Sequence, residues 1–178
     1  MPVQCRRGCR ASETTAHVLQ LCKHVERPRM ARHNCLVDLF ATYGVKKHWD
    51  VRTEVHMRIN GRGYRPDLVI NSPSGCWIVD AQIVSGSEDN PLSNAHQEKK
   101  SKYDTAQIRS AVAAVMNVDV VSVRVVAATI TWRGVWYKRS AAELKKVGFP
   151  DFILSWAVTR VLNGGSYIWS VYVRSGAR

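Results

Sequence analysis

Hydrophobic and polar residues recur along the chain at spacings that predict a mixed α/β protein. Residues 30–43 carry apolar side chains at helical spacing, and we expect a helix that Gly44 ends. Residues 51–59 alternate between apolar and polar side chains, which is typical of a half-buried strand. Residues 118–131 are rich in Val, Ile and Ala, and their composition and length indicate a central strand. The pattern predicts a mixed sheet with helices on both faces.

Local signals place further elements between these segments. A turn at 61–63 would lead into a strand that contains Leu68, so that three antiparallel strands form a meander. A possible capping box, Ser140 to Glu143, would open a short helix that Gly148 ends. We also expect helices over 93–103, 105–117 and 150–162, the last stopped at 163–165, and a final strand over 167–173.

Two acidic residues flank a predicted hairpin. Asp67 precedes the apolar run 68–70, Asp80 follows the run 76–79, and the segment between them is rich in Ser, Pro and Gly. If residues 72–75 form a symmetric four-residue loop, Asn71 pairs with Cys76 and Asp67 lies opposite Asp80 on the same face. At about 5 Å and an effective dielectric near 20, two such charges repel by about 3 kcal/mol. A divalent cation such as Mg²⁺ would offset this repulsion. The alternatives are two solvated acids on an exposed strand face, or a register shifted by a bulge.

The charge of the chain indicates a polyanionic partner. Its 178 residues include 26 Lys and Arg against 14 Asp and Glu, which gives a net charge of +12. We therefore expect nucleic-acid binding that weakens as salt rises. No apolar stretch is long enough for a membrane span, and arginines stand where a signal peptide would be apolar. These features predict a cytosolic or nuclear protein that does not contact membranes, and we expect a nuclear location after synthesis in the cytoplasm.

Four Cys and His residues near the N-terminus have the spacing of a zinc site. Cys5, Cys9, His17 and Cys22 form a C-x3-C-x7-H-x4-C pattern, which suits a tetrahedral zinc ion. Bound zinc could fold a segment that has little core of its own. We expect a zinc knuckle over residues 1–27, a short linker near 26–29, and a second domain over 28–178. The two other cysteines, Cys35 and Cys76, are expected in the core.

Metal-dependent cleavage of a phosphodiester needs carboxylates that hold the metal ion and, in addition, a cation beside the scissile phosphate. The familiar nuclease motif has a lysine two residues after the second acid, but that position here is Gln82. Lys99 is our first candidate for the replacement and Lys102 the second. Glu54 is a candidate third acid. A solvated lysine-rich helix is the alternative interpretation of this segment.

An ordered series of motifs resembles the C-terminal end of the R-two type non-LTR retrotransposon protein. The series runs from the Cys/His pattern through Arg32-His33-Asn34 and Arg65-Pro66-Asp67-x12-Asp80 to Ala95-His96-x2-Lys99-x3-Tyr103-Asp104, and so covers most of the chain. The resemblance implies a zinc knuckle followed by a restriction-endonuclease-like core of the Pro-Asp-(Asp/Glu)-x-Lys class. It further implies that Asp67 and Asp80 bind Mg²⁺ or Mn²⁺ and that Lys99 is the displaced lysine.

The resemblance also implies a function. The chain would nick a chromosomal DNA target so that the freed 3′ hydroxyl primes reverse transcription. The reverse transcriptase would lie upstream in the parent polyprotein, and element RNA is a further candidate partner. Two alternatives remain open: a nucleic-acid-binding module without activity, and a nuclease of similar fold that acts on branched DNA or RNA. The residues expected to contact nucleic acid are Arg6, Arg7, Arg10, Arg27, Arg29, Arg32, His33 and Tyr103.

Overall fold

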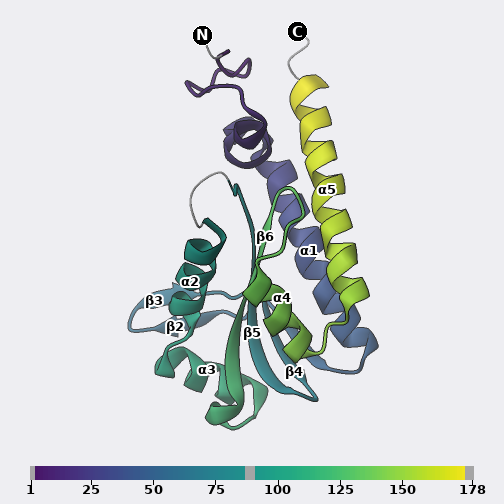
Figure 1. The fold of residues 1–178 in the computed structure, drawn as a ribbon. Coiled ribbons are helices and arrows are strands. Elements are labelled where there is room, and N and C mark those ends of the chain that lie inside the picture. Colours follow the sequence, from purple (N-terminus) through teal and green to yellow (C-terminus); the bar gives the residue numbers. More distant parts are fainter. Residues whose placement is uncertain (1–2, 87–90, 175–178) are drawn as a thin grey trace.

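The computed structural model describes residues 3–86 and 91–174, and it has a mixed sheet covered by helices on both faces (Figure 1). The sheet has the order β1-β4-β5-β6, with bounds Asp50–Thr53, Leu68–Ser72, Gly75–Val84 and Val123–Thr131. β1, β4 and β5 are antiparallel neighbours, whereas β6 runs parallel to β5. The prediction of a mixed sheet between helices is confirmed.

Helices fill both sides of the sheet because its strands are apolar on both faces. One face packs against α1 (Glu26–Lys46), α4 (Lys138–Val147) and α5 (Asp151–Arg174). The other packs against α2 (Pro91–Tyr103), α3 (Ala106–Met116) and a hairpin. Double coverage explains the nearly continuous apolar sequence of β6. None of the helices in the described part of the chain is both long and apolar enough to cross a membrane.

The hairpin that carries the acids has the predicted pairing. Asn71 is opposite Cys76, and the ladder continues to Leu68 opposite Val79. The connection is shorter than predicted, because Ser72 and Gly75 also pair and leave only residues 73–74 in the turn. The predicted four-residue loop and the observed two-residue turn are symmetric about the same point, so the two strands pair in the predicted register.

The predicted antiparallel meander is confirmed, because β1 pairs with β4 and β4 pairs with β5, but the connection from β1 to β4 is longer than the predicted turn. The alternating segment 51–59 is divided into β1 and β2 (Met57–Ile59) by Glu54, whose φ is 51°. β2 and β3 (Arg62–Tyr64) form a separate two-stranded hairpin around a turn at Asn60 and Gly61, which both have positive φ. β6 is an edge strand, not the predicted central one, and a short helical turn (Val120–Ser122) precedes it.

Several predicted helix boundaries also differ. The expected linker at 26–29 is the first turn of α1, which continues past Gly44 to Lys46. The Ser140 hydroxyl does not cap a helix, because it donates to the Ala127 carbonyl in β6. The helix predicted to stop at 163–165 continues as α5 to Arg174, so the final strand predicted over 167–173 is helical.

The N-terminal segment packs against the C-terminal half of α5 (Figure 1). A helical turn (His17–Leu21) and a second one (Lys23–Val25) precede α1. Val18 and Cys22 share a buried cluster with Ile168 and Tyr172 of α5. The two ends of the chain therefore stabilise one another. Of the two cysteines expected in the core, Cys76 is buried but Cys35 is exposed.

Candidate functional site

The first candidate site lies where the β4–β5 ladder ends. Asp67 directly precedes β4. Asp80 lies within β5, two residues after Ile78, which is opposite Val69 in β4. The Asp67 Oδ2 atom accepts a hydrogen bond of 2.7 Å from the Ala81 N–H. The side chain of Asp67 therefore reaches across to the strand that carries Asp80.

Asp80 is a buried acid that pairs with a lysine from α2. Only 3% of the residue is exposed, and its Oδ2 atom lies 2.5 Å from the Lys99 Nζ atom. On β5, Asp80 points to the same face as Ile78, and α2 packs over that face. Lys99 thus places a cation beside Asp80 from α2, and not from the strand position that Gln82 occupies. Gln82 donates instead to the Thr129 hydroxyl in β6, at 2.8 Å.

His33 approaches Asp67 from α1. Its Nε2 atom lies 3.3 Å from Asp67 Oδ2 and 3.2 Å from the Ala81 carbonyl oxygen. The hydrogen bond to Asp67 raises the pKa of His33, although burial opposes this effect. A cavity of about 300 Å³ opens beside this contact and is lined by His33, Asp67, Glu54 and Asp38 among others. The two acids are thus each contacted by a basic group from a different helix.

The other predicted catalytic residues lie around this centre without joining it. Glu54 is exposed and pairs with Arg65 at 3.1 Å. Lys102 places its Nζ atom 4.6 Å from the centre of the Tyr103 ring. The Tyr103 hydroxyl donates to the Arg65 carbonyl, and burial, followed by the nearby Asp80, raises the pKa of Tyr103. Within the described residues, Glu54 does not form a group of three close acids with Asp67 and Asp80.

The donor set of this centre suits a hard cation such as Mg²⁺. Asp67 and Asp80 each place one carboxylate oxygen, Oδ2, in a contact with protein groups. Carboxylate oxygens supplemented by water and phosphate are the ligands that Mg²⁺ prefers. The buried Asp80 also needs more positive charge around it than a solvated acid would. The residues therefore fit the ion that the sequence predicts.

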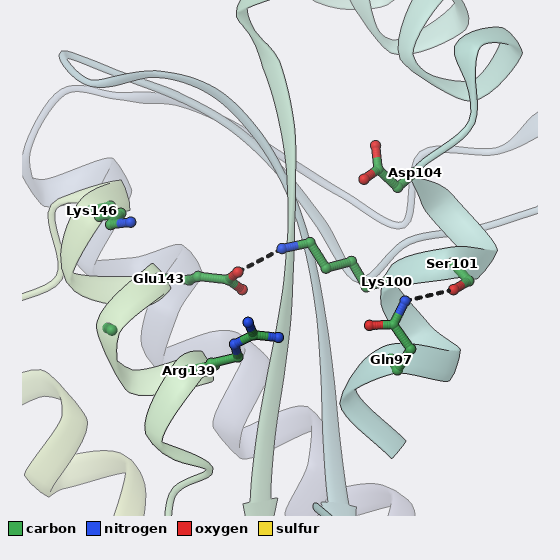
Figure 2. Close-up of a pocket in the computed structure, with 8 residues that line it drawn as sticks. Gln97, Lys100, Ser101, Asp104, Arg139, Glu143 and Lys146 are labelled. Carbon is green, nitrogen blue, oxygen red and sulfur yellow. Dashed lines mark hydrogen bonds and ion pairs between the residues drawn. The ribbon is translucent and has the colours of Figure 1, made fainter. Parts of the chain in front are cut away.

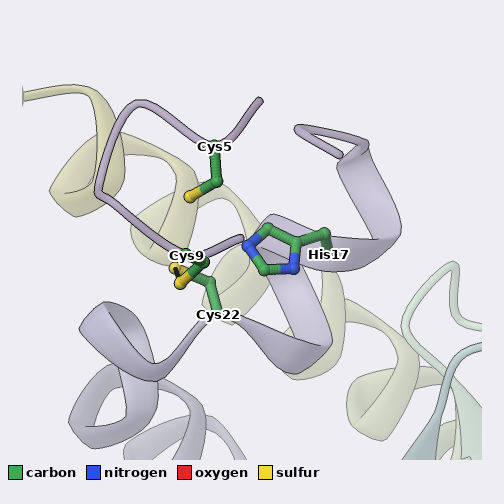
Figure 3. A group of neighbouring side chains, drawn as sticks. All are labelled: Cys5, Cys9, His17 and Cys22. Carbon is green, nitrogen blue, oxygen red and sulfur yellow. Dashed lines mark hydrogen bonds between the residues drawn. The ribbon is translucent and has the colours of Figure 1, made fainter. Parts of the chain in front are cut away.

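The second candidate site is the Cys/His cluster (Figure 3). One ligand atom from each of Cys5, Cys9, His17 and Cys22 lies within 4.8 Å of the others. The Cys9 and Cys22 sulfur atoms are 3.7 Å apart. Three sulfurs and one imidazole at this spacing can hold a zinc ion. In the described part of the chain, no other group of three or more Cys, His, Asp or Glu residues meets this criterion.

The protein around the cluster favours one thiolate. Burial alone would raise the pKa of Cys5, but hydrogen bonds from Tyr172, His17 and backbone groups lower it to about 6. The Cys5 sulfur lies 3.1 Å from the Tyr172 hydroxyl oxygen, and this hydroxyl donates its proton to Glu13 Oε2 at 2.8 Å. Burial raises the pKa of Cys22 to about 11, so this thiol would lose its proton only when a metal binds.

Tyr172 is a residue that the sequence analysis missed. Tyr172 contacts Cys5, which lies 167 positions earlier in the chain. The strand that we predicted over 167–173 did not imply a contact with the N-terminal segment. The Ala81 backbone, which contacts both Asp67 and His33, was missed as well, because a main-chain group has no sequence signal.

The arginines predicted to contact nucleic acid have different environments. Arg10 and Arg27 are exposed, and Arg6 pairs with Glu13 at 2.5 Å. Arg29 donates to the Gln20 carbonyl. Arg32 is only 3% exposed, and burial lowers its pKa to about 10. This burial argues against a phosphate contact at Arg32. Arg7, which is partly buried, remains a predicted contact.

Comparison with known proteins gives homologues over almost the whole chain, although no family model matches it. The chain is 32% identical over 174 residues to the retrovirus-related Pol polyprotein from type-1 retrotransposable element R2 of Nasonia vitripennis. It is 30% identical over 169 residues to the polyprotein of the same name from Bradysia coprophila. It is 32% identical over 161 residues to the Pol polyprotein from type-2 retrotransposable element R2DM of Drosophila melanogaster.

The alignments cover most of this chain but only a small fraction of each relative. They cover 98%, 94% and 88% of the chain but only 17%, 19% and 15% of the three polyproteins. The chain thus corresponds to less than a fifth of each. Along nearly all of its length, the chain is homologous to segments of R2 retrotransposon Pol polyproteins.

Proposed function

We propose that the chain is a metal-dependent DNA endonuclease module of a retrotransposon Pol polyprotein. It would nick a chromosomal target so that the freed 3′ hydroxyl primes reverse transcription. The observation that carries this proposal is the buried Asp80 paired with Lys99 at 2.5 Å, beside Asp67 at the end of the same hairpin. Paired acids with an adjacent lysine are the set that metal-assisted phosphodiester hydrolysis requires. A restriction-endonuclease-like core of the Pro-Asp-(Asp/Glu)-x-Lys class is part of the same proposal.

Each residue would have a distinct task. Asp67 and Asp80 would hold Mg²⁺ or Mn²⁺, which supplies an activated water and a counter-charge for the leaving oxygen. Lys99 would balance the charge that develops on the phosphate. His33 would orient Asp67 through the 3.3 Å contact between them. Lys102 and Glu54 remain the weaker catalytic candidates.

Hydrolysis would leave the ends that priming needs. The water oxygen forms a bond to phosphorus, the bond between phosphorus and the 3′ oxygen breaks, and that oxygen takes up a proton. The products are a 3′ hydroxyl and a 5′ phosphate. The substrate of this reaction would be DNA in the nucleus. The reverse transcriptase that uses the 3′ hydroxyl would be a domain elsewhere in the parent chain, and element RNA would be a further ligand.

The zinc module would support binding and not chemistry. Its exposed cations, including Arg10 and Arg27, can contact phosphates without reading sequence. Because the module packs on α5, it would hold these cations at a fixed position relative to the sheet.

A nicking assay on supercoiled plasmid tests the proposal. The wild type should nick with Mg²⁺ or Mn²⁺, whereas Asp67→Asn and Asp80→Asn should reduce the rate at least a hundredfold. Asp151→Asn is the matched control, because this exposed acid on α5 forms an ion pair with the exposed Lys145, far from both proposed metal ligands in the sequence, and should be dispensable. Equal nicking by all four proteins would remove the catalytic assignment.

The same proteins distinguish the alternatives. A binding module without activity would show no metal-dependent nicking, and its affinity for DNA would stay the same or rise in the Asp→Asn variants as repulsion falls. A structure-specific nuclease would cleave junction or flap substrates in preference to duplex DNA.

A further inference from the structure

A groove that is lined by α2 but does not include Asp80, Asp67 or Lys99 has no role in the proposed reaction. It lies between α2 and α4, above the edge strand β6 (Figure 2). A cavity of about 610 Å³ adjoins a second one of about 410 Å³, and the two share Lys100, Asp104, Glu143 and Lys146. The shared residues make the two cavities one continuous groove, which we call the β6 groove.

Cations outnumber acids along the β6 groove. Its lining contains five cations and two carboxylates. Glu143 pairs with Lys100 at 2.6 Å, and Asp104 lies 3.6 Å from Arg109. Both acids are thus already neutralised by groove residues. The cations that remain are Arg124, Arg139 and Lys146.

These three cations have no carboxylate partner among the described residues. Arg139 and Lys146 are exposed residues of α4, and neither is within 4.0 Å of a described acid. The Arg124 guanidinium lies 5.1 Å from the centre of the Trp77 ring, so it packs on an aromatic face and not on an acid. Three unpaired cations along one groove favour a ligand with regularly spaced negative charges.

The geometry favours a single strand over a duplex. A helix stands on each side of the β6 groove, and the Lys100–Glu143 ion pair joins the two helices across it (Figure 2). The cavities have the volume of small-molecule sites, which can take a few linked nucleotides but not a double helix.

Lys99 and Lys100 separate the groove from the candidate catalytic centre. These neighbours on α2 point to different sides, because the Lys99 Nζ atom contacts Asp80 and the Lys100 Nζ atom contacts Glu143. We propose that the β6 groove binds the phosphodiester backbone of one nucleic-acid strand, at a place distinct from the strand that is cut. The inference rests on the proposed function only in its choice of nucleic acid as the polyanion.

Charge removal in the groove tests this inference. The variant Arg139→Gln/Lys146→Gln should bind a labelled single strand about tenfold more weakly than the wild type. For single strands each lost phosphate contact makes the negative slope of log K against log salt shallower by about 0.7, so the magnitude of the slope should fall by about 1.4. Lys46→Gln/Arg160→Gln removes two exposed cations elsewhere and is the matched control. Fluorescence anisotropy without a divalent metal measures binding alone.

Three ligands identify the strand. Single-stranded DNA and RNA of the same sequence show which backbone binds, and a duplex should lose little affinity in the groove variant. The inference is overturned if both double variants weaken binding equally, or if only duplex binding falls. It is also overturned if an acidic peptide, and not nucleic acid, loses affinity in the groove variant alone.

The outcome is independent of the nicking assay. If Asp67→Asn and Asp80→Asn nick like the wild type while the groove variant loses single-strand affinity, the groove stands and the proposed nuclease activity falls. If nicking depends on the acids but the groove variant binds normally, the nuclease proposal stands and the groove inference falls.

Discussion

The side chain of Arg32 in α1 lies directly on Gly164 in α5. A Cβ atom built on Gly164 would come within 2.8 Å of the Arg32 Cβ atom, which is too close for two carbon atoms. The Arg32 guanidinium then continues past α5 to donate to the Leu19 carbonyl and the Gln20 side chain. The absence of a side chain at one position of α5 thus lets α1 hold the N-terminal module.

We expect Gly164→Ala to destabilise the protein although alanine favours helices. Helix propensity would add about 1 kcal/mol of stability, but overpacking costs about 1–3 kcal/mol. The steric cost should win because the clash involves the Arg32 Cβ atom, which moves only with the backbone of α1. Urea unfolding of the zinc-loaded protein should show a net loss of up to about 2 kcal/mol in the free energy of unfolding.

The next residue provides the control. A Cβ atom on Gly165 would meet only the Arg32 Nη1 atom at 3.9 Å and a Leu19 methyl at 4.0 Å, which are ordinary contacts. Gly165→Ala should therefore be neutral or slightly stabilising. Equal effects of the two substitutions would show that the approach of α1 does not determine the role of Gly164.

The same pair of glycines explains an error in the sequence analysis. Asn163-Gly164-Gly165 has the composition of a helix stop, and we predicted a strand after it. In the structure Gly164 allows the close approach of Arg32, and α5 continues through both glycines to Arg174. A local pattern could not reveal this, because the requirement comes from Arg32, which is more than 130 residues away.

Other parts of the site could be read from local sequence. The pairing of Asn71 with Cys76 followed from the symmetry of the turn and did not depend on its exact length. The Cys/His spacing predicted a cluster that the structure brings together. The contact between His33 and Asp67 was not predictable, since it depends on how α1 packs over the end of the sheet.

We expect Lys99 and Lys102 to differ strongly in their effect on nicking. Lys99→Ala removes the cation 2.5 Å from Asp80 and should lower the nicking rate at least a hundredfold. Lys102→Ala removes a lysine that contacts the Tyr103 ring, and should lower the rate less than tenfold. Rates measured with saturating Mg²⁺ and DNA separate this effect from binding.

Folding must be checked for the Lys99 variant, because its removal leaves Asp80 buried without a partner. Breaking a buried pair in this way costs about 3–5 kcal/mol. Lys99→Met/Asp80→Asn removes both charges and should regain stability without regaining activity. A Lys102→Ala protein that is inactive while Lys99→Ala still nicks would exchange the two assignments.

Zinc removal should destabilise the C-terminal half of α5 as well as the N-terminal segment. Cys22 shares a buried cluster with Ile168 and Tyr172, so a disordered knuckle would uncover that part of the helix. The wild type should bind one zinc ion per chain, and Cys22→Ser should bind it far more weakly. Hydrogen exchange at residues 165–172 should become faster in the variant or after chelation.

Cys35→Ser is the matched control, because this cysteine is exposed and lies outside the cluster. It should leave zinc content and hydrogen exchange unchanged. Fast exchange confined to residues 3–25 after chelation would show that α5 does not depend on the metal.

The stability of the protein should fall below neutral pH because of His96. Burial lowers the pKa of His96 from 6.5, although the nearby Glu143 opposes the shift and Lys100 and Arg139 add to it. The unfolded chain therefore takes up a proton near pH 6.5 that the native protein takes up only at lower pH. The stabilising contribution of neutral His96 is complete above pH 6.5 and is lost progressively as the pH falls below it.

The variant His96→Gln isolates this effect. Its amide can still donate to the Ala127 carbonyl, which the His96 Nδ1 atom contacts at 3.2 Å, but it does not titrate. Urea unfolding in excess zinc between pH 7.5 and 5.5 should show a steeper fall in the free energy of unfolding for the wild type than for the variant. Zinc release at low pH affects both proteins alike, so it cancels in the comparison. Parallel curves would mean that His96 gains its proton equally easily in the native and unfolded states.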